Sequence, residues 1–297
     1  MITRILLNRS SKSLKTRLIH FFYNRIIRIM PPFLVMLSCY IITNPSNSSK
    51  NDTAVIIALL NLADYDIAFN WSNILSSGLG FCWSLSIEEK FYFFLPFVLF
   101  TPINNFWKII VLIFGCITWK AILVILGVEW LRIAASFDTR YDELLIGCAC
   151  ALATHSNIFR KKTFAHKELL GVLALIVIFV GFHAIPHPSE LILKHQQVMF
   201  WCLVMPGFCA CTGIMLLSFC NNAKDTTIQR ILQLPPINHI GKISYSLYLW
   251  HGLVFMEGNI TNSNLMHQSG LFLTTLLTAW VSFRLFEKPL QKFKCSN

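Results

Sequence analysis

Charged side chains are scarce in this sequence: Asp, Glu, Lys and Arg make up only 13 % of its 297 residues. That share is about half of what a soluble globular domain carries. Apolar residues reach 55 %. A soluble enzyme of this length could not cover its surface with so few charges, and a disordered or fibrous chain would be less apolar. The composition therefore predicts an all-α fold, a polytopic bundle of membrane-spanning helices.

The sequence also lacks the motifs of several enzyme and metal-binding classes. It has no Cys-x-x-Cys pair, no GxSxG or HExxH motif and no glycine-rich phosphate loop. Almost all of its 10 cysteines lie inside apolar runs, so we interpret them as small apolar residues rather than disulfide or zinc ligands. His183, His187 and His195 surround one predicted loop without a recognised ligand spacing. We therefore expect no metal cofactor.

Long apolar runs recur along the chain and predict about eight membrane spans. The runs lie at residues 29–43, 80–100, 106–127, 140–155, 169–185, 197–220, 240–257 and 270–286. We expect a single membrane domain over residues 1–297, with the spans between residues 29 and 286. Residues 1–25 form a basic cytoplasmic segment and residues 287–297 a cytoplasmic tail in this interpretation.

The net charge is +11, and the positions of the Lys and Arg residues along the chain indicate the membrane topology. If the N-terminus is cytoplasmic and the spans alternate, most of the 25 Lys and Arg residues fall on the cytoplasmic side. The outer segments then hold only Lys50, Arg132, Arg140 and Lys194. This bias predicts that both termini are cytoplasmic. It also accounts for the basic character, so membrane lipid is the expected partner and nucleic acid is not.

Ionisable residues inside spans are costly and indicate functional sites by default. Glu88 and Glu89 lie within one predicted span, and Ser84, Glu88 and Tyr92 share a helix face because they are four residues apart. This face could form a polar site at membrane depth. An alternative is a buried ion pair or a hydrogen-bonded contact between helices.

A second polar stripe lies on the predicted span at residues 240–257. Ser244, Tyr248 and His251 follow one another at spacings of four and three residues, which places them on one helix face. A histidine can exchange protons near neutral pH, so His251 is a candidate acid–base group. A buried structural histidine is the alternative.

Two arginine motifs complete the candidates. Arg140 and Glu143 can pair at a spacing of three residues near the outer face, which could also be a purely local ion pair. Arg25 and Arg28 lie one turn apart on the cytoplasmic side. They could extend to lipid headgroups, or they could hold a phosphorylated cofactor because guanidinium groups match phosphate geometry.

Taken together and in this order, these motifs resemble acyltransferase family 3, multi-span membrane enzymes that O-acylate surface carbohydrates. The matching segments are Phe22–Pro32, Trp83–Tyr92, Arg140–Gly147, Ile243–His251 and Ser282–Pro289. They are spread over essentially the whole chain. The combination of WSLSIEE with SYSLYLWH in one sequence is a specific signal.

The resemblance implies a membrane-bound O-acyltransferase of the bacterial inner membrane. It would move an acyl group, expected to be acetyl, from acyl-CoA to a hydroxyl of a lipid-linked or nascent glycan such as lipopolysaccharide O-antigen or exopolysaccharide. Arg25 and Arg28 would hold the phosphates of acyl-CoA. Glu88 and His251 would orient the acceptor or relay its proton. The acceptor would also contact Arg140, Asp142, Ser244 and Tyr248.

One departure from the family pattern lies at the N-terminus. The segment Phe22–Pro32 resembles the third span of the family, so the first two family spans are expected to be missing, together with the histidine that is taken as the catalytic base there. The expectation is a shortened chain that binds and orients substrates better than it catalyses. A proton- or lipid-translocating membrane protein and a non-catalytic remnant are the alternatives.

Overall fold

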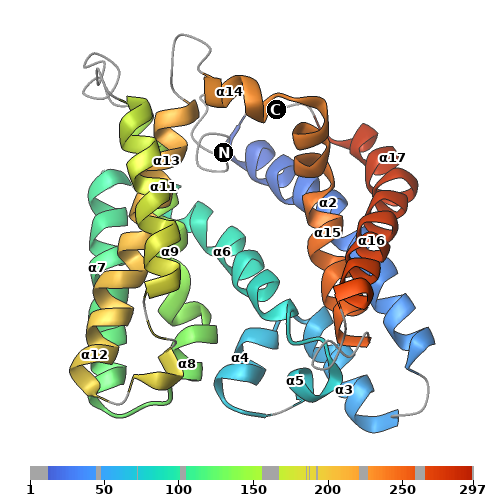
Figure 1. Ribbon diagram of the computed structural model, residues 1–297, viewed down its shortest axis with the longest axis horizontal. Coiled ribbons are helices and arrows are strands. Elements are labelled where there is room, and N and C mark those ends of the chain that lie inside the picture. Colours follow the sequence, from blue (N-terminus) through green and yellow to red (C-terminus); the bar gives the residue numbers. More distant parts are fainter. Residues whose placement is uncertain are drawn as a thin grey trace. The chain divides into compact units, whose positions relative to one another are not determined.

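The computed structural model describes residues 13–44, 48–71, 73–100, 105–155, 167–184, 186, 188–191, 193–220, 227–257 and 265–295. Over these ranges the chain forms helices and turns and no strand (Figure 1), which confirms the all-α prediction. The fold consists of two compact units. Among the described residues, the first unit contains 67–70 and 83–231, and the second contains 13–66, 71–82 and 232–295.

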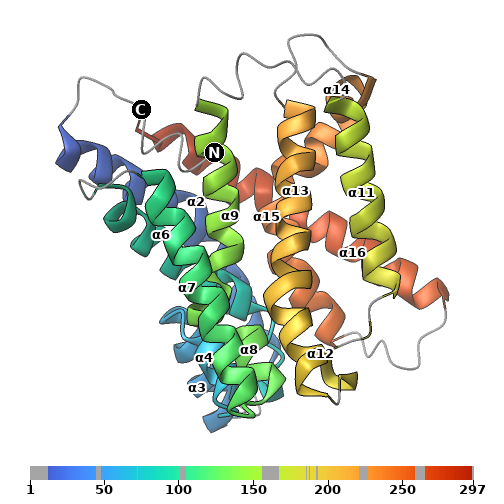
Figure 2. The ribbon, with the colours of Figure 1, turned by 90° about the vertical axis from the view of Figure 1, so that its left-hand side faces the viewer.

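The first unit is a bundle of long apolar helices with short helices between them. Its elements are α6 (Cys82–Phe100), α7 (Asn105–Ile125), α8 (Trp130–Ala135), α9 (Phe137–His155), α11 (Lys167–Ala184), η1 (Pro188–Glu190), α12 (Lys194–Met199), η2 (Phe200–Val204), α13 (Met205–Cys220) and α14 (Thr227–Leu232). Helix α9 packs against both α7 and α13, and α11 packs against α13; all four are roughly aligned in Figures 1 and 2. Trp201 of η2 is buried in an apolar cluster with Leu123, Val124 and Ile133.

The second unit combines the two ends of the sequence. Its elements are α2 (Leu14–Thr43), α3 (Ser48–Leu59), α4 (Ala63–Ala68), α5 (Asn73–Ser77), α15 (Pro235–Glu257), α16 (Leu265–Ser282), η4 (Phe283–Glu287), α17 (Lys288–Leu290) and η5 (Gln291–Phe293). Helix α15 packs against α16 and α2. Buried apolar residues of α2, among them Phe33 and Met36, form part of this unit's core.

Helix α2 begins earlier than the apolar run at 29–43 predicts. The Ser13 hydroxyl accepts a hydrogen bond from the Thr16 amide at 3.3 Å and caps the helix, so the described part of the basic N-terminal segment is helical. Residues 1–12 of that segment lie outside the described residues. Pro31 and Pro32 lie inside α2. Proline has no backbone N–H to donate, so helix carbonyls one turn earlier are left without their usual partner. In the same stretch of α2, the Ile29 carbonyl accepts a hydrogen bond from the Tyr245 hydroxyl of α15 at 2.9 Å.

Each predicted apolar run falls largely on a helix of the structure. Of the described helical segments, 4 are long and apolar enough to cross a membrane: Leu14–Thr43, Asn105–Ile125, Lys194–Ser218 and Met266–Phe293. The segment Leu169–Gly181 is apolar but shorter.

Candidate functional site

Glu88 lies on α6 in the first unit, where its side chain is exposed. Its Oε2 atom accepts a hydrogen bond from the Tyr92 hydroxyl at 2.8 Å. The two residues are four apart on one helix, so the structure confirms that they share a face. The tyrosine thereby restricts the orientation of the carboxylate.

Arg140 and Glu143 form the predicted ion pair near the start of α9. The guanidinium and carboxylate are 2.9 Å apart, and both side chains are largely buried. The Arg140 guanidinium also lies 5.7 Å from the ring centroid of Trp83 on α6. Glu143 Oε1 is buried and has no hydrogen-bond partner among the described residues. One oxygen of this carboxylate is therefore able to accept a further hydrogen bond.

Asp142 occupies a different environment from its neighbours. It is fully buried, and its Oδ2 atom is 2.8 Å from the ammonium group of Lys120 on α7, which is also fully buried. Cys116, one turn before Lys120, donates a weak hydrogen bond to Asp142 Oδ1 at 3.4 Å. Both carboxylate oxygens are therefore occupied. Contact between Asp142 and an acceptor stays a prediction.

The sequence interpretation did not assign a partner to Lys120. A lysine inside a membrane span needs a counter-charge, so the sequence indicates that Lys120 has a partner. It does not indicate which helix supplies the carboxylate. Glu287 is also buried, with 3 % exposure, and it accepts a hydrogen bond from the buried Ser246 hydroxyl. The sequence interpretation had placed it in the cytoplasmic tail.

His251 and Tyr248 lie on α15 in the second unit, and both contact Phe81, the residue just before α6. The Tyr248 hydroxyl donates to the Phe81 carbonyl at 2.5 Å. The Phe81 ring centroid is 6.0 Å from those of both Tyr248 and His251. A Cβ atom at Gly252 would overlap the Phe81 ring, so glycine permits this close approach. Ser244, one turn before Tyr248, is exposed.

The hydrogen bonding of His251 determines which of its ring nitrogens can act as a base. Nδ1 lies 2.5 Å from the Tyr248 carbonyl oxygen. A carbonyl can only accept, so Nδ1 is the donor and carries the proton. In the neutral ring, Nε2 is then the unprotonated nitrogen. The side chain is exposed.

Arg25 and Arg28 lie on α2 in the second unit. The Arg25 guanidinium is 5.8 Å from the Phe21 ring centroid, and the Arg28 side chain is exposed. Their unit also holds His251, Tyr248 and Ser244, whereas Glu88, Arg140 and Asp142 belong to the first unit. A common site for Glu88 and His251 stays a prediction.

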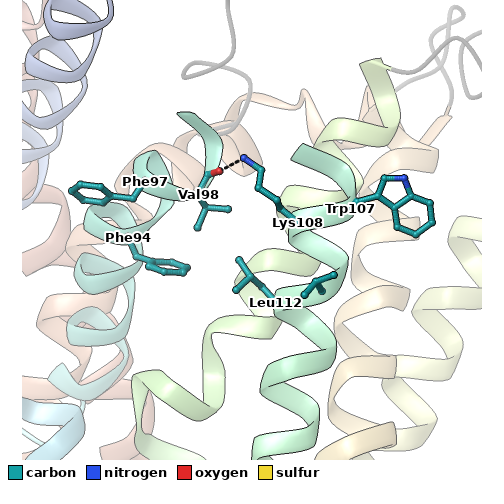
Figure 3. Close-up of a pocket in the computed structure, with 7 residues that line it drawn as sticks. Phe94, Phe97, Val98, Trp107, Lys108 and Leu112 are labelled. Atoms are coloured by element: carbon teal, nitrogen blue, oxygen red, sulfur yellow. Dashed lines mark hydrogen bonds between the residues drawn. The ribbon is translucent and has the colours of Figure 1, made fainter. Parts of the chain in front are cut away.

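An apolar groove of about 480 Å³ lies between α6 and α7 in the first unit (Figure 3). Phe94 and Leu112 point toward each other across it, while the Lys108 ammonium group donates to the Val98 carbonyl. The other lining residues are Phe97, Trp107 and Val111. This lining suits a hydrocarbon chain better than a sugar, and it includes none of the predicted site residues. The described residues also contain no group of three His, Cys, Asp or Glu side chains arranged to hold a metal ion.

Comparison with known proteins gives one family over almost the whole chain. A family profile described as an acyltransferase domain matches residues 5–284. The peptidoglycan O-acetyltransferase OatA of Listeria monocytogenes is 26 % identical over 316 residues, covering 98 % of this chain and 49 % of the relative. The O-acetyltransferase OatA of Staphylococcus aureus is 24 % identical over 316 residues, covering 98 % and 50 %.

The chain thus spans about half the length of these curated relatives. No solved structure gives a significant match. The apolar helices and the membrane acyltransferase relatives together make this a multi-pass membrane protein. The profile match, which includes the WSLSIEE and SYSLYLWH segments, establishes that the chain belongs to acyltransferase family 3.

Proposed function

We propose that the protein is a membrane-bound O-acetyltransferase that moves an acetyl group from acetyl-CoA to a hydroxyl of a cell-surface glycan. The family match over residues 5–284 carries this proposal, since it includes both the WSLSIEE and the SYSLYLWH motifs. The relatives named as O-acetyltransferases support acetyl as the transferred group.

In the proposed reaction, His251 Nε2 accepts the proton of the acceptor hydroxyl. Glu88 stays a predicted contact of the acceptor. The hydroxyl oxygen attacks the thioester carbonyl carbon, so a C–O bond forms and the C–S bond breaks. The proton held by His251 then passes to the sulfur of CoA. General acid–base assistance of this kind contributes roughly 10²- to 10⁴-fold to a rate.

The other predicted residues are assigned to binding. Arg25 and Arg28 hold the phosphates of the donor, because guanidinium groups pair with phosphate oxygens. Arg140, Ser244 and Tyr248 contact the acceptor. Asp142 remains a predicted acceptor contact, although the Lys120 and Cys116 contacts already occupy its carboxylate.

The name of the Listeria relative favours peptidoglycan as the acceptor over lipopolysaccharide or exopolysaccharide. The test is to express the protein in a bacterium without its own O-acetyltransferase and to purify all three glycans from the same cells. Mild base then releases ester-bound acetate, which is measured by chromatography. We expect acetate on peptidoglycan. No added acetate on any glycan would overturn the proposed function.

His183 provides a matched control for the role of His251. Its Nδ1 atom also lies near a backbone carbonyl, that of Phe179 at 2.9 Å, and its ring lies 4.6 Å from the Phe179 ring. We expect His251→Ala to lower acetate transfer by roughly 10²-fold or more, as for loss of an acid–base group, while His183→Ala leaves it unchanged. Equal transfer by both variants would contradict the role of His251.

We also propose about eight spans with both termini in the cytoplasm. The hydrogen bonds between Asn24 of α2 and Cys295 support this topology, because they bring the two basic ends of the chain to the same side. Green fluorescent protein fused after the C-terminus folds only in the cytoplasm. Fluorescent cells are expected, and dark cells with a well-expressed fusion would contradict the topology.

A further inference from the structure

Phe81, the residue just before α6, contacts two side chains of α15 at once. Its ring centroid is 6.0 Å from that of His251, with the ring planes at 61°, and 6.0 Å from that of Tyr248, with the planes at 74°. The Tyr248 and His251 rings are themselves 5.7 Å apart. All three residues belong to the second unit. The rings therefore form one cluster in which each contacts the other two, at separations that aromatic pairs prefer.

The position of the Phe81 ring is fixed by contacts that do not involve His251. The Phe81 carbonyl accepts a hydrogen bond from the Tyr248 hydroxyl at 2.5 Å, which holds its backbone against α15. The ring itself lies where a side chain at residue 252 would stand, and Gly252 has none. The hydrogen bond and the space left by the glycine hold the ring in place, so it can act as a fixed neighbour for the imidazole.

The imidazole of His251 needs such a neighbour to keep one orientation. Its side chain is exposed, and the outer side-chain torsion of histidine has broad energy wells. Its Nδ1 atom donates to the Tyr248 carbonyl three residues earlier on the same helix, and a single hydrogen bond of this kind contributes little net free energy. A rotated ring would lose this bond, and either ring nitrogen could then carry the proton of the neutral form. The Phe81 contact adds a second restraint that opposes this rotation.

We propose that Phe81 is a positioning residue for His251. Its ring keeps the imidazole in the orientation in which Nδ1 donates to the Tyr248 carbonyl and Nε2 is left unprotonated. The inference rests on the proposed function where it concerns acetate transfer, since Nε2 is there the atom that accepts the proton of the acceptor hydroxyl. Phe81 takes no part in the proton transfer and acts through His251.

The tautomer of His251 is the measurement closest to this role, and it needs no substrate. The full chain is isotopically labelled at the histidine ring nitrogens, placed in phosphatidylcholine nanodiscs and studied by NMR at alkaline pH. The signals of His251 are those missing from His251→Ala. We expect a protonated Nδ1 and an unprotonated Nε2 in the unchanged protein, and a mixture of both tautomers in Phe81→Leu. Phe81→Tyr keeps a ring at this place and should resemble the unchanged protein.

Phe93 provides a matched control, because its ring also pairs with another ring, that of Phe97 at 5.3 Å, but within the first unit. Acetate transfer is measured for both variants as ester-bound acetate released from purified glycan. We expect Phe81→Leu to lower transfer roughly two- to tenfold, as for loss of one aromatic contact, and Phe93→Leu to leave it unchanged. An equal loss in both variants would contradict a specific role of Phe81.

A paired substitution separates positioning from packing. Gly252→Ala alone introduces a methyl group that overlaps the Phe81 ring, whereas Phe81→Ala removes the ring and makes room for it. The double variant should therefore be more thermally stable than Gly252→Ala. Its acetate transfer should stay as low as that of Phe81→Ala and its His251 tautomers mixed, because the ring is absent. Recovery of stability, transfer and tautomer together would show that Phe81 serves packing alone and would overturn the inference.

The possible outcomes distinguish this inference from the proposed function. If His251→Ala loses transfer while Phe81→Leu keeps full transfer and a protonated Nδ1, the inference is wrong and the role of His251 stands. If His251→Ala transfers acetate as well as the unchanged protein does, the role of His251 in the proposed function is overturned. The tautomer measurement then still decides the inference: mixed tautomers in Phe81→Leu support it, and an unchanged, protonated Nδ1 overturns it.

Discussion

Removal of one partner from the Lys120–Asp142 pair should destabilise the protein strongly. The ammonium and carboxylate groups are 2.8 Å apart, and neither side chain has any exposed surface. Asp142→Leu leaves the Lys120 charge buried between α7 and α9 without a counter-charge. Lys120→Met does the same to Asp142. Each single substitution should therefore lower the free energy of unfolding by the cost of an unpaired charge in an apolar environment.

The expected magnitude follows from the complete burial of the pair. Breaking a buried ion pair by removal of one partner costs about 3–5 kcal/mol. Since about 1.4 kcal/mol corresponds to a factor of ten, the folding equilibrium should shift by roughly 10²- to more than 10³-fold. The double variant with Lys120→Met and Asp142→Leu removes both charges and retains much of the volume. Its stability should lie close to that of the unchanged protein.

The assay is reversible unfolding of the purified protein in mixed micelles, followed by tryptophan fluorescence. Lys288→Met serves as the control, because Lys288 is exposed and its loss should have little effect. A single Asp142→Leu variant as stable as the unchanged protein would refute the buried pair. A double variant as unstable as the singles would also refute it, because the cost would then not arise from the unpaired charge.

The same double variant tests whether Asp142 contacts the acceptor. If it is stable and still transfers acetate to glycan, the predicted contact between Asp142 and the acceptor is wrong. If it is stable but transfers little acetate, Asp142 has a role beyond its pairing with Lys120. Acetate released from purified glycan, normalised to the amount of folded protein, gives this answer.

Two further substitutions each test a contact within one unit. Gly252→Ala should lower the melting temperature, since its new methyl group would overlap the Phe81 ring and overpacking costs about 1–3 kcal/mol; Gly241→Ala on the same helix has open space and should not. A Gly252→Ala variant as stable as Gly241→Ala would contradict the close approach. Asp138→Ala should cost about 1.5–3 kcal/mol of unfolding free energy, because its carboxylate accepts hydrogen bonds of 2.9 and 2.8 Å from Arg132. Unchanged denaturant unfolding would show that this pair contributes nothing.

Contacts within one helix could be predicted from the sequence. The Tyr92–Glu88 hydrogen bond and the Arg140–Glu143 ion pair join residues four and three positions apart. Helix geometry places such residues on one face whatever the rest of the fold does. The apolar runs predicted helices for the same reason, because composition and length alone specify a membrane-spanning helix.

Contacts between helices could not be predicted in this way. In a soluble protein the polar face of a helix indicates which side is outside, but lipid and protein interior are both apolar, so the rotation of a spanning helix leaves little trace in the sequence. The partner of Lys120 on α9 was missed for this reason. The hydrogen bonds between Asn24 and Cys295 likewise could not be predicted from local sequence patterns.

The amino-acid sequence by itself determined that the chain is helical and membrane-spanning, and its motifs pointed to its family. These properties depend on hydrophobicity along the chain and on short motifs. The tertiary structure alone decided that Lys120 pairs with Asp142, that Nδ1 of His251 donates to the Tyr248 carbonyl, and that Cys295 is hydrogen-bonded to Asn24 of α2. These features depend on how helices pack and rotate against each other, which side-chain complementarity across distant segments determines.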